Sequence, residues 1–185
     1  AWIDKRSDAG DIYAQRVDST GNLVWSPNGT PICTASGSQL DPVIVSDDAG
    51  GAIIVWSDGR SDGGDIYAQR VDASGTVQWA FSGVPVCVAA NTQYEQTATL
   101  DEAHGAIIAW SDNRTGDTDI YSQRLTASGS AVWTINGIGV AVVAEPNDRP
   151  TIVTDDKGGA IVAWDDWRST DQQIFLQHLS SGGTS

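Results

Sequence analysis

Apolar and polar positions along the chain follow one pattern that returns at a fixed interval. Residues 51–58 (GAIIVWSD) contain an unbroken apolar run, and related runs stand at residues 105–112 and 159–166. A strand that faces solvent on one side alternates in polarity, so an unbroken run predicts a strand covered on both faces. A lone four-stranded sheet cannot provide that cover, and each sheet must pack against neighbouring sheets.

One unit of the pattern predicts four strands joined by short turns. They are expected at residues 42–47, 51–58, 65–72 and 77–88. The last strand is expected to be broken by a bulge near Ser82 and Gly83. Two tight turns, 48–50 and 73–75, separate strands, because Asp and Gly adopt positive φ at low cost.

This unit is 54 residues long, and its tryptophans set the register. Residues 1–54 and 55–108 are identical at 27 positions, and no insertion or deletion separates the copies. A strict period predicts one repetitive domain, 1–185, rather than two unrelated domains. Its units are 1–54, 55–108, 109–162 and the incomplete 163–185. The recurring aromatic positions are Trp2, Trp56, Trp110 and Trp164; Trp25, Trp79 and Trp133; and Tyr13, Tyr67 and Tyr121, with Phe175 in the last copy.

The predicted fold class is all-β, a β-propeller built of four-stranded blades. Blades of roughly 40 to 50 residues, with sheets packed on either side, are typical of propellers. An open β-solenoid or a stacked array of sandwiches is the alternative. The chain holds about 3.5 blades, too few to close a ring, because propellers typically have at least about four. We therefore expect a ring closed by a second chain, in a head-to-tail homodimer, or by the missing blades of a larger parent chain.

The repeat resembles one found in large secreted bacterial proteins, W-x-D-x-R … D-I-Y-x-Q-R … G … W. The residues that carry this resemblance are Trp56-Ser57-Asp58-Gly59-Arg60, Asp65-Ile66-Tyr67-Ala68-Gln69-Arg70, Gly75 and Trp79. It covers the whole chain and implies a propeller-like extracellular repeat without naming an activity. A more distant similarity is to sialidase-type propellers, although the S-x-D-x-G-x-T-W order of their Asp box is absent. No signal peptide opens the sequence, but the chain starts within a repeat, so this does not argue against secretion.

Charge narrows the range of partners. The net charge is −14, and the only lysines are Lys5 and Lys157. Such a chain repels the phosphate backbone of nucleic acids and an anionic membrane surface. No stretch approaches the roughly 18 apolar residues that a membrane-spanning helix needs. The acidic surface fits solubility in a salty or extracellular setting, or attraction of cations.

Recurrent charged residues are expected in the loops at one end of each blade. There the loop between the second and third strands lies beside the loop that leads to the next blade. Propellers commonly bind ligands on such a face, and the candidate ligand residues are Trp167, Tyr94, Asn91, Asp62 and Arg60. The favoured alternative is a structural staple in which planar Arg pairs with carboxylates, because the set recurs in every copy. The staple residues are Asp4, Arg6, Asp58, Arg60, Asp65, Asp112, Arg114, Asp119, Asp166 and Arg168.

Metal and thiol chemistry find little support in the sequence. Ca²⁺ takes about six to eight oxygen ligands, and the loop 62–65 lacks the spacing of a dedicated calcium loop. No cofactor is expected, with Ca²⁺ left as an alternative. Cys33 and Cys87 are repeat-equivalent, and a disulfide needs Cα atoms roughly 4.4 to 6.8 Å apart. Because equivalent positions on neighbouring blades lie farther apart, we expect two free, buried thiols.

Catalysis is not expected within this chain, since one set of residues repeats where a catalytic site needs different residues in different roles. His104 and His178 have no evident nucleophile beside them. Trp167 breaks the repeat, standing where the other copies have Lys5, Gly59 and Asn113, and its indole suits stacking on a sugar ring. The favoured function is a noncatalytic extracellular binding or scaffolding module with glycans as ligands. The alternative is a part of a secreted sialidase-like or other glycan-active hydrolase whose catalytic blades lie elsewhere.

Overall fold

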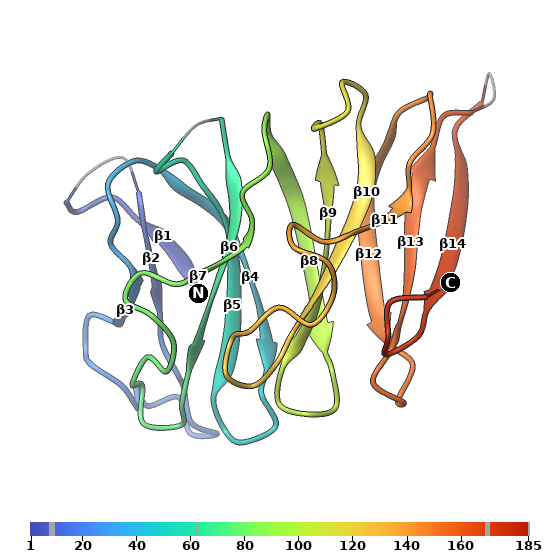
Figure 1. Cartoon of the computed structure of the whole chain (residues 1–185). Coiled ribbons are helices and arrows are strands. Elements are labelled where there is room, and N and C mark those ends of the chain that lie inside the picture. Colours follow the sequence, from blue (N-terminus) through green and yellow to red (C-terminus); the bar gives the residue numbers. More distant parts are fainter. Residues whose placement is uncertain (8–9, 62, 169–170, 185) are drawn as a thin grey trace.

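The protein consists of four antiparallel sheets that follow the 54-residue period (Figure 1). The computed structural model describes residues 1–7, 10–61, 63–168 and 171–184, which form strands, turns and loops and no helix. Sheet 1 contains β1 (Trp2–Asp4), β2 (Asp11–Ala14) and β3 (Thr30–Cys33). Sheet 2 contains β4 (Gln39–Ser46), β5 (Ala52–Asp58), β6 (Asp65–Val71) and β7 (Val84–Cys87). Sheet 3 contains β8 (Gln93–Leu100), β9 (Ala106–Asp112), β10 (Asp119–Leu125) and β11 (Ile138–Ala141), and sheet 4 contains β12 (Asn147–Thr154), β13 (Ala160–Asp166) and β14 (Gln173–Leu179).

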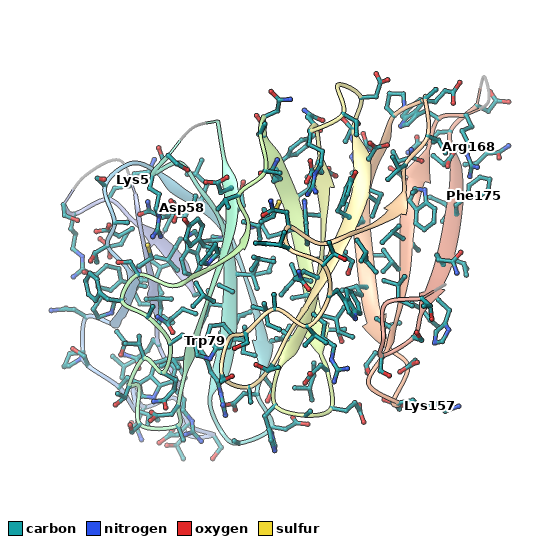
Figure 2. The ribbon with its side chains drawn as sticks, in the orientation of Figure 1. Lys5, Asp58, Trp79, Lys157, Arg168 and Phe175 are labelled. Atoms are coloured by element: carbon teal, nitrogen blue, oxygen red, sulfur yellow. The ribbon has the colours of Figure 1, made fainter. Side chains whose placement is uncertain are left out.

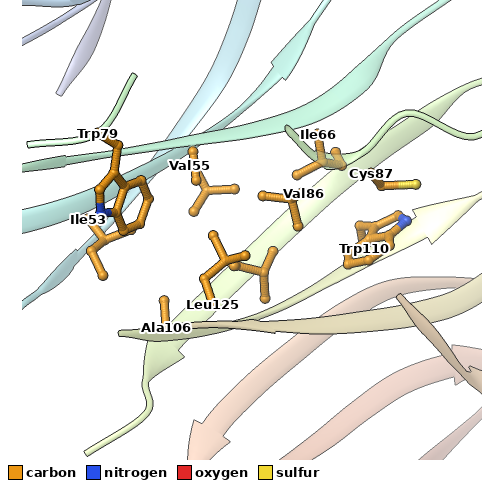
Figure 3. Packing of buried hydrophobic residues seen from close by; sticks show 11 residues of the cluster. Ile53, Val55, Ile66, Trp79, Val86, Cys87, Ala106, Trp110 and Leu125 are labelled. Carbon is orange, nitrogen blue, oxygen red and sulfur yellow. The ribbon is translucent and has the colours of Figure 1, made fainter. Parts of the chain in front are cut away.

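The sheets pack face to face in chain order, and the core lies in the three spaces between them (Figure 1). We call the face of each sheet that meets the next sheet its front face, and the opposite face its back face. Between sheets 2 and 3, the front-face residues Ile53, Ile66 and Val86 pack on the back-face residues Trp110 and Leu125 (Figure 3). Repeat-equivalent residues fill the other two joints, so the hydrophobic effect stabilises all three in the same way.

The second strand of each inner sheet is buried on both faces. Ile53 and Ile54 point to opposite sides of sheet 2 and both are fully buried, as are Ile107 and Ile108 in sheet 3. The interpretation of the unbroken apolar runs as strands covered on both faces is therefore confirmed for β5 and β9.

Hydrogen bonds from tryptophan reinforce the joints near the outer edge of the sheets. The indole Nε1 of Trp79 in sheet 2 donates to the carbonyl oxygen of Ala127, at the end of sheet 3, over 3.0 Å. Arg70 Nη1 donates to the same oxygen over 3.2 Å. The equivalent pairs are Trp25 and Arg16 on Ala73, and Trp133 and Arg124 on Ser181. Hydrogen bonds therefore join each sheet to the next, in addition to the hydrophobic packing between them.

The predicted length of the fourth strand, residues 77–88, is wrong. Only residues 84–87 form β7, and Val77 makes a single bridge to Val71. Ser82 and Gly83 have φ of 60° and 90°, so the chain turns there instead of bulging within a strand. Gly83 also lies against Trp56, where an added Cβ would be 2.5 Å from the ring. The pairing of β6 with β7 is irregular at Val86, which lies between Pro85 and Cys87, the partners of Tyr67 and Ile66.

The sheets in Figure 1 form an open row. The all-β class and the antiparallel meander of four strands are confirmed, and no closed barrel is found among the described residues. Closure into a propeller ring stays a prediction. The described part of the chain also contains no helix long and apolar enough to span a membrane.

Candidate functional site

An Asp–Arg pair recurs in every sheet, at the ends of β1, β5, β9 and β13 (Figure 2 labels Asp58 and Arg168). In sheet 2, Arg60 Nε and Nη2 donate to the two carboxylate oxygens of Asp58 over 2.8 and 2.6 Å. The indole Nε1 of Trp56 donates to the same carboxylate over 2.7 Å. The guanidinium carbon of Arg60 lies 3.9 Å from the centre of the Tyr67 ring, a cation–π contact. Asp58 is fully buried, and these contacts replace its lost hydration.

The pair also reaches the preceding sheet. Arg60 Nη2 lies 3.2 Å from Cys33 Sγ of sheet 1, and it donates to the carbonyl oxygen of Ser82 over 2.8 Å. Arg114 makes the same contacts with Cys87, at 3.1 Å, and with the carbonyl oxygen of Asn136, at 2.8 Å. Arg60, a candidate ligand residue, is therefore engaged within the joint between sheets 1 and 2.

Burial and pairing set the protonation of these groups. The Arg6 guanidinium holds the pKa of Asp4 at about 2, and Arg168 likewise lowers the pKa of Asp166. Burial raises the pKa of the Cys87 thiol to about 12 and also raises the pKa of Cys33. Both cysteines are free and buried, which confirms the prediction for them.

The remaining staple candidates have partners of a different kind. The Ser61 hydroxyl donates to Asp65. Asp119 accepts from Thr115 Oγ1 over 2.5 Å and from the backbone N–H of Val143 over 3.2 Å. Asp62 lies outside the described residues.

Trp167 lies in the loop after β13, with 41% of its surface exposed. Beside it on β12, Asp148 has one carboxylate oxygen, Oδ1, that is buried without a hydrogen-bond partner among the described residues. Burial raises the pKa of Asp148, and the nearby carboxylate of Glu95 raises it further. Arg149 and a hydrogen bond from Trp167 act on this pKa in the opposite direction.

Glu95 of sheet 3 joins these residues of sheet 4. Its Oε2 accepts from Ser111 Oγ over 3.0 Å and from the backbone N–H of Arg149 over 3.0 Å. Arg149 Nη1 in turn lies 3.4 Å from Asp165 Oδ2. Glu95 and Arg149 both have a φ of 53°, and each lies where its strand, β8 or β12, pairs irregularly with the next strand. We name this cluster the rim site; its residues are Glu95, Ser111, Asp148, Arg149, Asp165 and Trp167.

Two further ligand candidates lie along the same rim. Tyr94 precedes Glu95, and its hydroxyl lies 3.2 Å from Thr118 Oγ1. The Asn91 side chain donates to the carbonyl oxygen of Asn113 over 3.2 Å, and Thr118 Oγ1 donates to the side chain of the same Asn113 over 2.8 Å. The backbone of Thr118 accepts from Asn147, which adjoins Asp148. Hydrogen bonds thus connect Asn91 and Tyr94 with Asn147, the residue that precedes Asp148 of the rim site.

Sequence reasoning singled out Trp167 but missed Glu95, Asp148 and Asp165. Their positions carried a usable signal, since the charge there differs among the copies, whereas the Asp–Arg pair is the same in every copy. Leu40, Tyr94 and Asp148 are equivalent, and so are Asp41, Glu95 and Arg149. Where charge varies at one position of a strict repeat, the shared fold does not require a particular charge at that position.

Metal ligands do not gather in the described residues. Across 1–7, 10–61, 63–168 and 171–184, no group of three or more His, Cys, Asp or Glu side chains is arranged to hold an ion. The two histidines have separate partners at the opposite edge of the sheets. His104 Nδ1 lies 2.9 Å from the carbonyl oxygen of Asp47, and His178 Nε2 lies 2.7 Å from Asp155 Oδ2.

Comparison with known proteins gives only distant structural matches. No family model and no curated protein matches the chain. An endo-arabinase from Bacteroides thetaiotaomicron is similar in structure, with 19% identity, a TM-score of 0.43, and coverage of 83% of this chain and 62% of that one. An endo-1,4-β-xylanase from the same organism gives 11% identity, a TM-score of 0.44, and coverage of 86% and 60%. The chain thus spans less than two thirds of either protein, and matches this distant do not indicate an activity.

Proposed function

We propose that the chain is a noncatalytic carbohydrate-binding β-propeller module and that the rim site contacts the sugar. One observation carries this proposal: the exposed indole of Trp167 stands beside Asp148, whose Oδ1 is buried without a hydrogen-bond partner among the described residues. A buried acceptor without a donor costs free energy, and a ligand hydroxyl recovers that cost where a turn of the Asp148 side chain brings this oxygen to the surface.

The other residues of the site fit the same ligand class. An indole offers a flat apolar face to the C–H face of a sugar ring, while its N–H still donates a hydrogen bond. Glu95 and Asp165 supply acceptors for hydroxyl groups, and the exposed Arg149 supplies donors. The net charge of −14 disfavours polyanionic glycans, so neutral sugars are the proposed ligands. In this proposal the module is secreted and needs no cofactor.

Binding to a panel of neutral oligosaccharides, measured by glycan array and then by calorimetry, tests the proposal. Trp167→Ala and Asp148→Ala are each expected to abolish or strongly weaken binding. Phe81→Ala is the matched control, because Phe81 is an exposed aromatic residue outside the rim site. Absence of any neutral ligand, or equal binding by Trp167→Ala and the control, would contradict the proposal.

A second candidate function rests on two neighbouring carboxyl groups, Asp148 and Glu95. Burial and the carboxylate of Glu95 raise the pKa of Asp148, and paired carboxyl groups serve as acid and base in glycoside hydrolysis. In this alternative the chain is part of a glycan-active hydrolase. Release of reducing ends from a bound oligosaccharide, lost in Asp148→Asn while binding persists, would favour it over the noncatalytic module.

A further inference from the structure

A cavity lies in the joint between sheets 1 and 2. It is bounded by β3, the last strand of sheet 1, and by residues 75–82, which precede β7 of sheet 2. Its volume is about 450 Å³, and pockets that hold small molecules typically measure roughly 300–1,000 Å³. Much of its wall is apolar, formed by Pro31, Ile32, Cys33, Val77 and Phe81. The cavity is therefore large enough and apolar enough to hold a small organic molecule.

Phe81 presents an uncovered aromatic ring at this cavity. The residue is 83% exposed, whereas Ile32 and Cys33 in the same wall are almost fully buried. Covering apolar surface is favourable in water, and aromatic rings also attract one another edge to face or in offset stacks. The cavity thus combines buried apolar side chains with an exposed ring that a flat ligand can contact.

The polar side chains of the cavity all carry a hydroxyl group. They are Tyr13, Thr30, Thr34, Thr76 and Ser82. None of the described residues that line the cavity is charged, although the net charge of the chain is −14. Because a hydroxyl group both donates and accepts hydrogen bonds, this wall suits an uncharged ligand with a hydroxyl group of its own.

The equivalent place between sheets 2 and 3 differs in these polar groups. Val88 stands there in the place of Thr34, and Asn136 in the place of Ser82. Asn136 spans that joint, because its Oδ1 accepts from the backbone N–H of Val88 over 3.1 Å. Between sheets 1 and 2, the shorter Ser82 has its Oγ 3.4 Å from the backbone nitrogen of Thr34. The hydroxyl groups of Thr34 and Ser82 are thus particular to this joint, and the shared fold does not require them.

We propose that this cavity binds a small, uncharged aromatic compound that carries a hydroxyl group, as a phenol does. The ring of the ligand contacts Phe81 and the apolar wall, and its hydroxyl group bonds to the threonine and serine hydroxyls. The rim site belongs to sheets 3 and 4, whereas the cavity belongs to sheets 1 and 2. This proposal therefore does not rest on the proposed glycan binding.

Calorimetric titration with 2-naphthol, a phenol that is uncharged at neutral pH, tests the proposal. The 185-residue chain is expected to bind it, and Phe81→Ala is expected to raise the Kd about tenfold because the aromatic contact is lost. Phe81 is exposed, so the variant should retain the circular dichroism of the parent. Ile135→Ala is the matched control, since Ile135 is the equivalent residue of sheet 3 and is 82% exposed, and it should bind as the parent does.

Two further variants alter the wall of the cavity. Val77→Phe fills part of the space and is expected to abolish binding. The double variant Thr30→Val with Thr34→Val carries the residues found at the equivalent positions, Val84 and Val88, and it is expected to bind more weakly while keeping the melting temperature of the parent. Equal binding by this double variant and the parent would contradict the role of the hydroxyl groups.

The two proposed sites can be distinguished by their ligands. Trp167→Ala is expected to lose sugar binding and to keep 2-naphthol binding, and Phe81→Ala is expected to show the reverse. No binding of 2-naphthol by the folded parent, or equal binding by Phe81→Ala and the parent, would overturn the proposal. Loss of 2-naphthol binding in Trp167→Ala, or its displacement by a neutral oligosaccharide, would also overturn it, since both results indicate that the phenol binds at the rim site.

Discussion

Replacement of Arg114 by alanine tests how strongly burial determines the contribution of the recurrent Asp–Arg pair to the free energy of unfolding. The Asp112 carboxylate is fully buried, and Arg114 Nη2 donates to it over 2.5 Å. Breaking a buried ion pair by removing one partner costs about 3–5 kcal/mol. Asp112 would keep donors from Trp110 Nε1 at 2.7 Å and from the backbone of residue 114 at 2.9 Å. We therefore expect Arg114→Ala to lower the free energy of unfolding by about 3 kcal/mol, the lower end of that range.

Arg6→Ala provides a matched control within the same chain. Arg6 pairs with Asp4 at 2.6 Å, but its side chain is 54% exposed, compared with 19% for Arg114. Exposed ion pairs contribute little to stability because water and salt screen them. The loss from Arg6→Ala should therefore be clearly smaller, although Arg6 contacts Asp4 through both Nε and Nη2 and Arg114 donates to Asp112 through Nη2.

Urea unfolding followed by tryptophan fluorescence measures both losses. Arg114→Lys should fall between wild type and Arg114→Ala, since a lysine keeps the charge but loses the stacking of the planar guanidinium on Tyr121. An equal or larger loss for Arg6→Ala would refute burial as the source of the effect.

Three further outcomes follow from particular residues. Burial and Glu95 raise the pKa of Asp148, so the free energy of unfolding should fall as pH rises from the ordinary carboxyl pKa through the raised one. Asp148→Asn should remove this pH dependence, and the variant should unfold at a higher urea concentration than wild type at neutral pH. Burial raises the pKa of Cys87 to about 12, so its thiol should react with a disulfide reagent at mildly alkaline pH only at the rate of unfolding; fast reaction with the folded protein would count against this. Gly129→Ala should destabilise more than Gly21→Ala in thermal melts: both glycines have positive φ, but an added Cβ lies 2.8 Å from the Trp79 ring at Gly129 and meets nothing within 4 Å at Gly21.

The regular part of the fold could be predicted because the same pattern of apolar and turn residues occurs in every copy of the repeat. The unbroken run ending at Trp56 predicted a strand buried on both faces, and Ile53 and Ile54 are buried on opposite sides. The hairpin turn at 48–50 could be predicted as well, and Asp48 and Gly50 both have positive φ. These features depend on residues that are neighbours in sequence.

The errors arose where distant contacts decide the outcome. Residues 77–83 have the composition of a strand, but the Trp79 side chain is held against sheet 3 and the left-handed Ser82 and Gly83 turn the chain away from the sheet. The rim site depends on contacts between sheets 3 and 4, such as Glu95 with the backbone of Arg149, and on left-handed backbone that sequence periodicity does not reveal. The spacing that recurs in every copy identifies the shared residues, and it gives no indication of the rim-site residues, which differ among copies.

The near-identity of the three joints also affects how the chain reaches its folded state. The front face of sheet 1 matches the back face of sheet 3 almost as well as that of its proper neighbour, sheet 2, since Ile54 and Trp56 correspond to Ile108 and Trp110. Partly folded chains can therefore dock sheets out of order, or exchange a sheet with another molecule, as is characteristic of repeat proteins. The loops between sheets, which are equally short in every copy, oppose such errors because they keep each sheet close to its own successor.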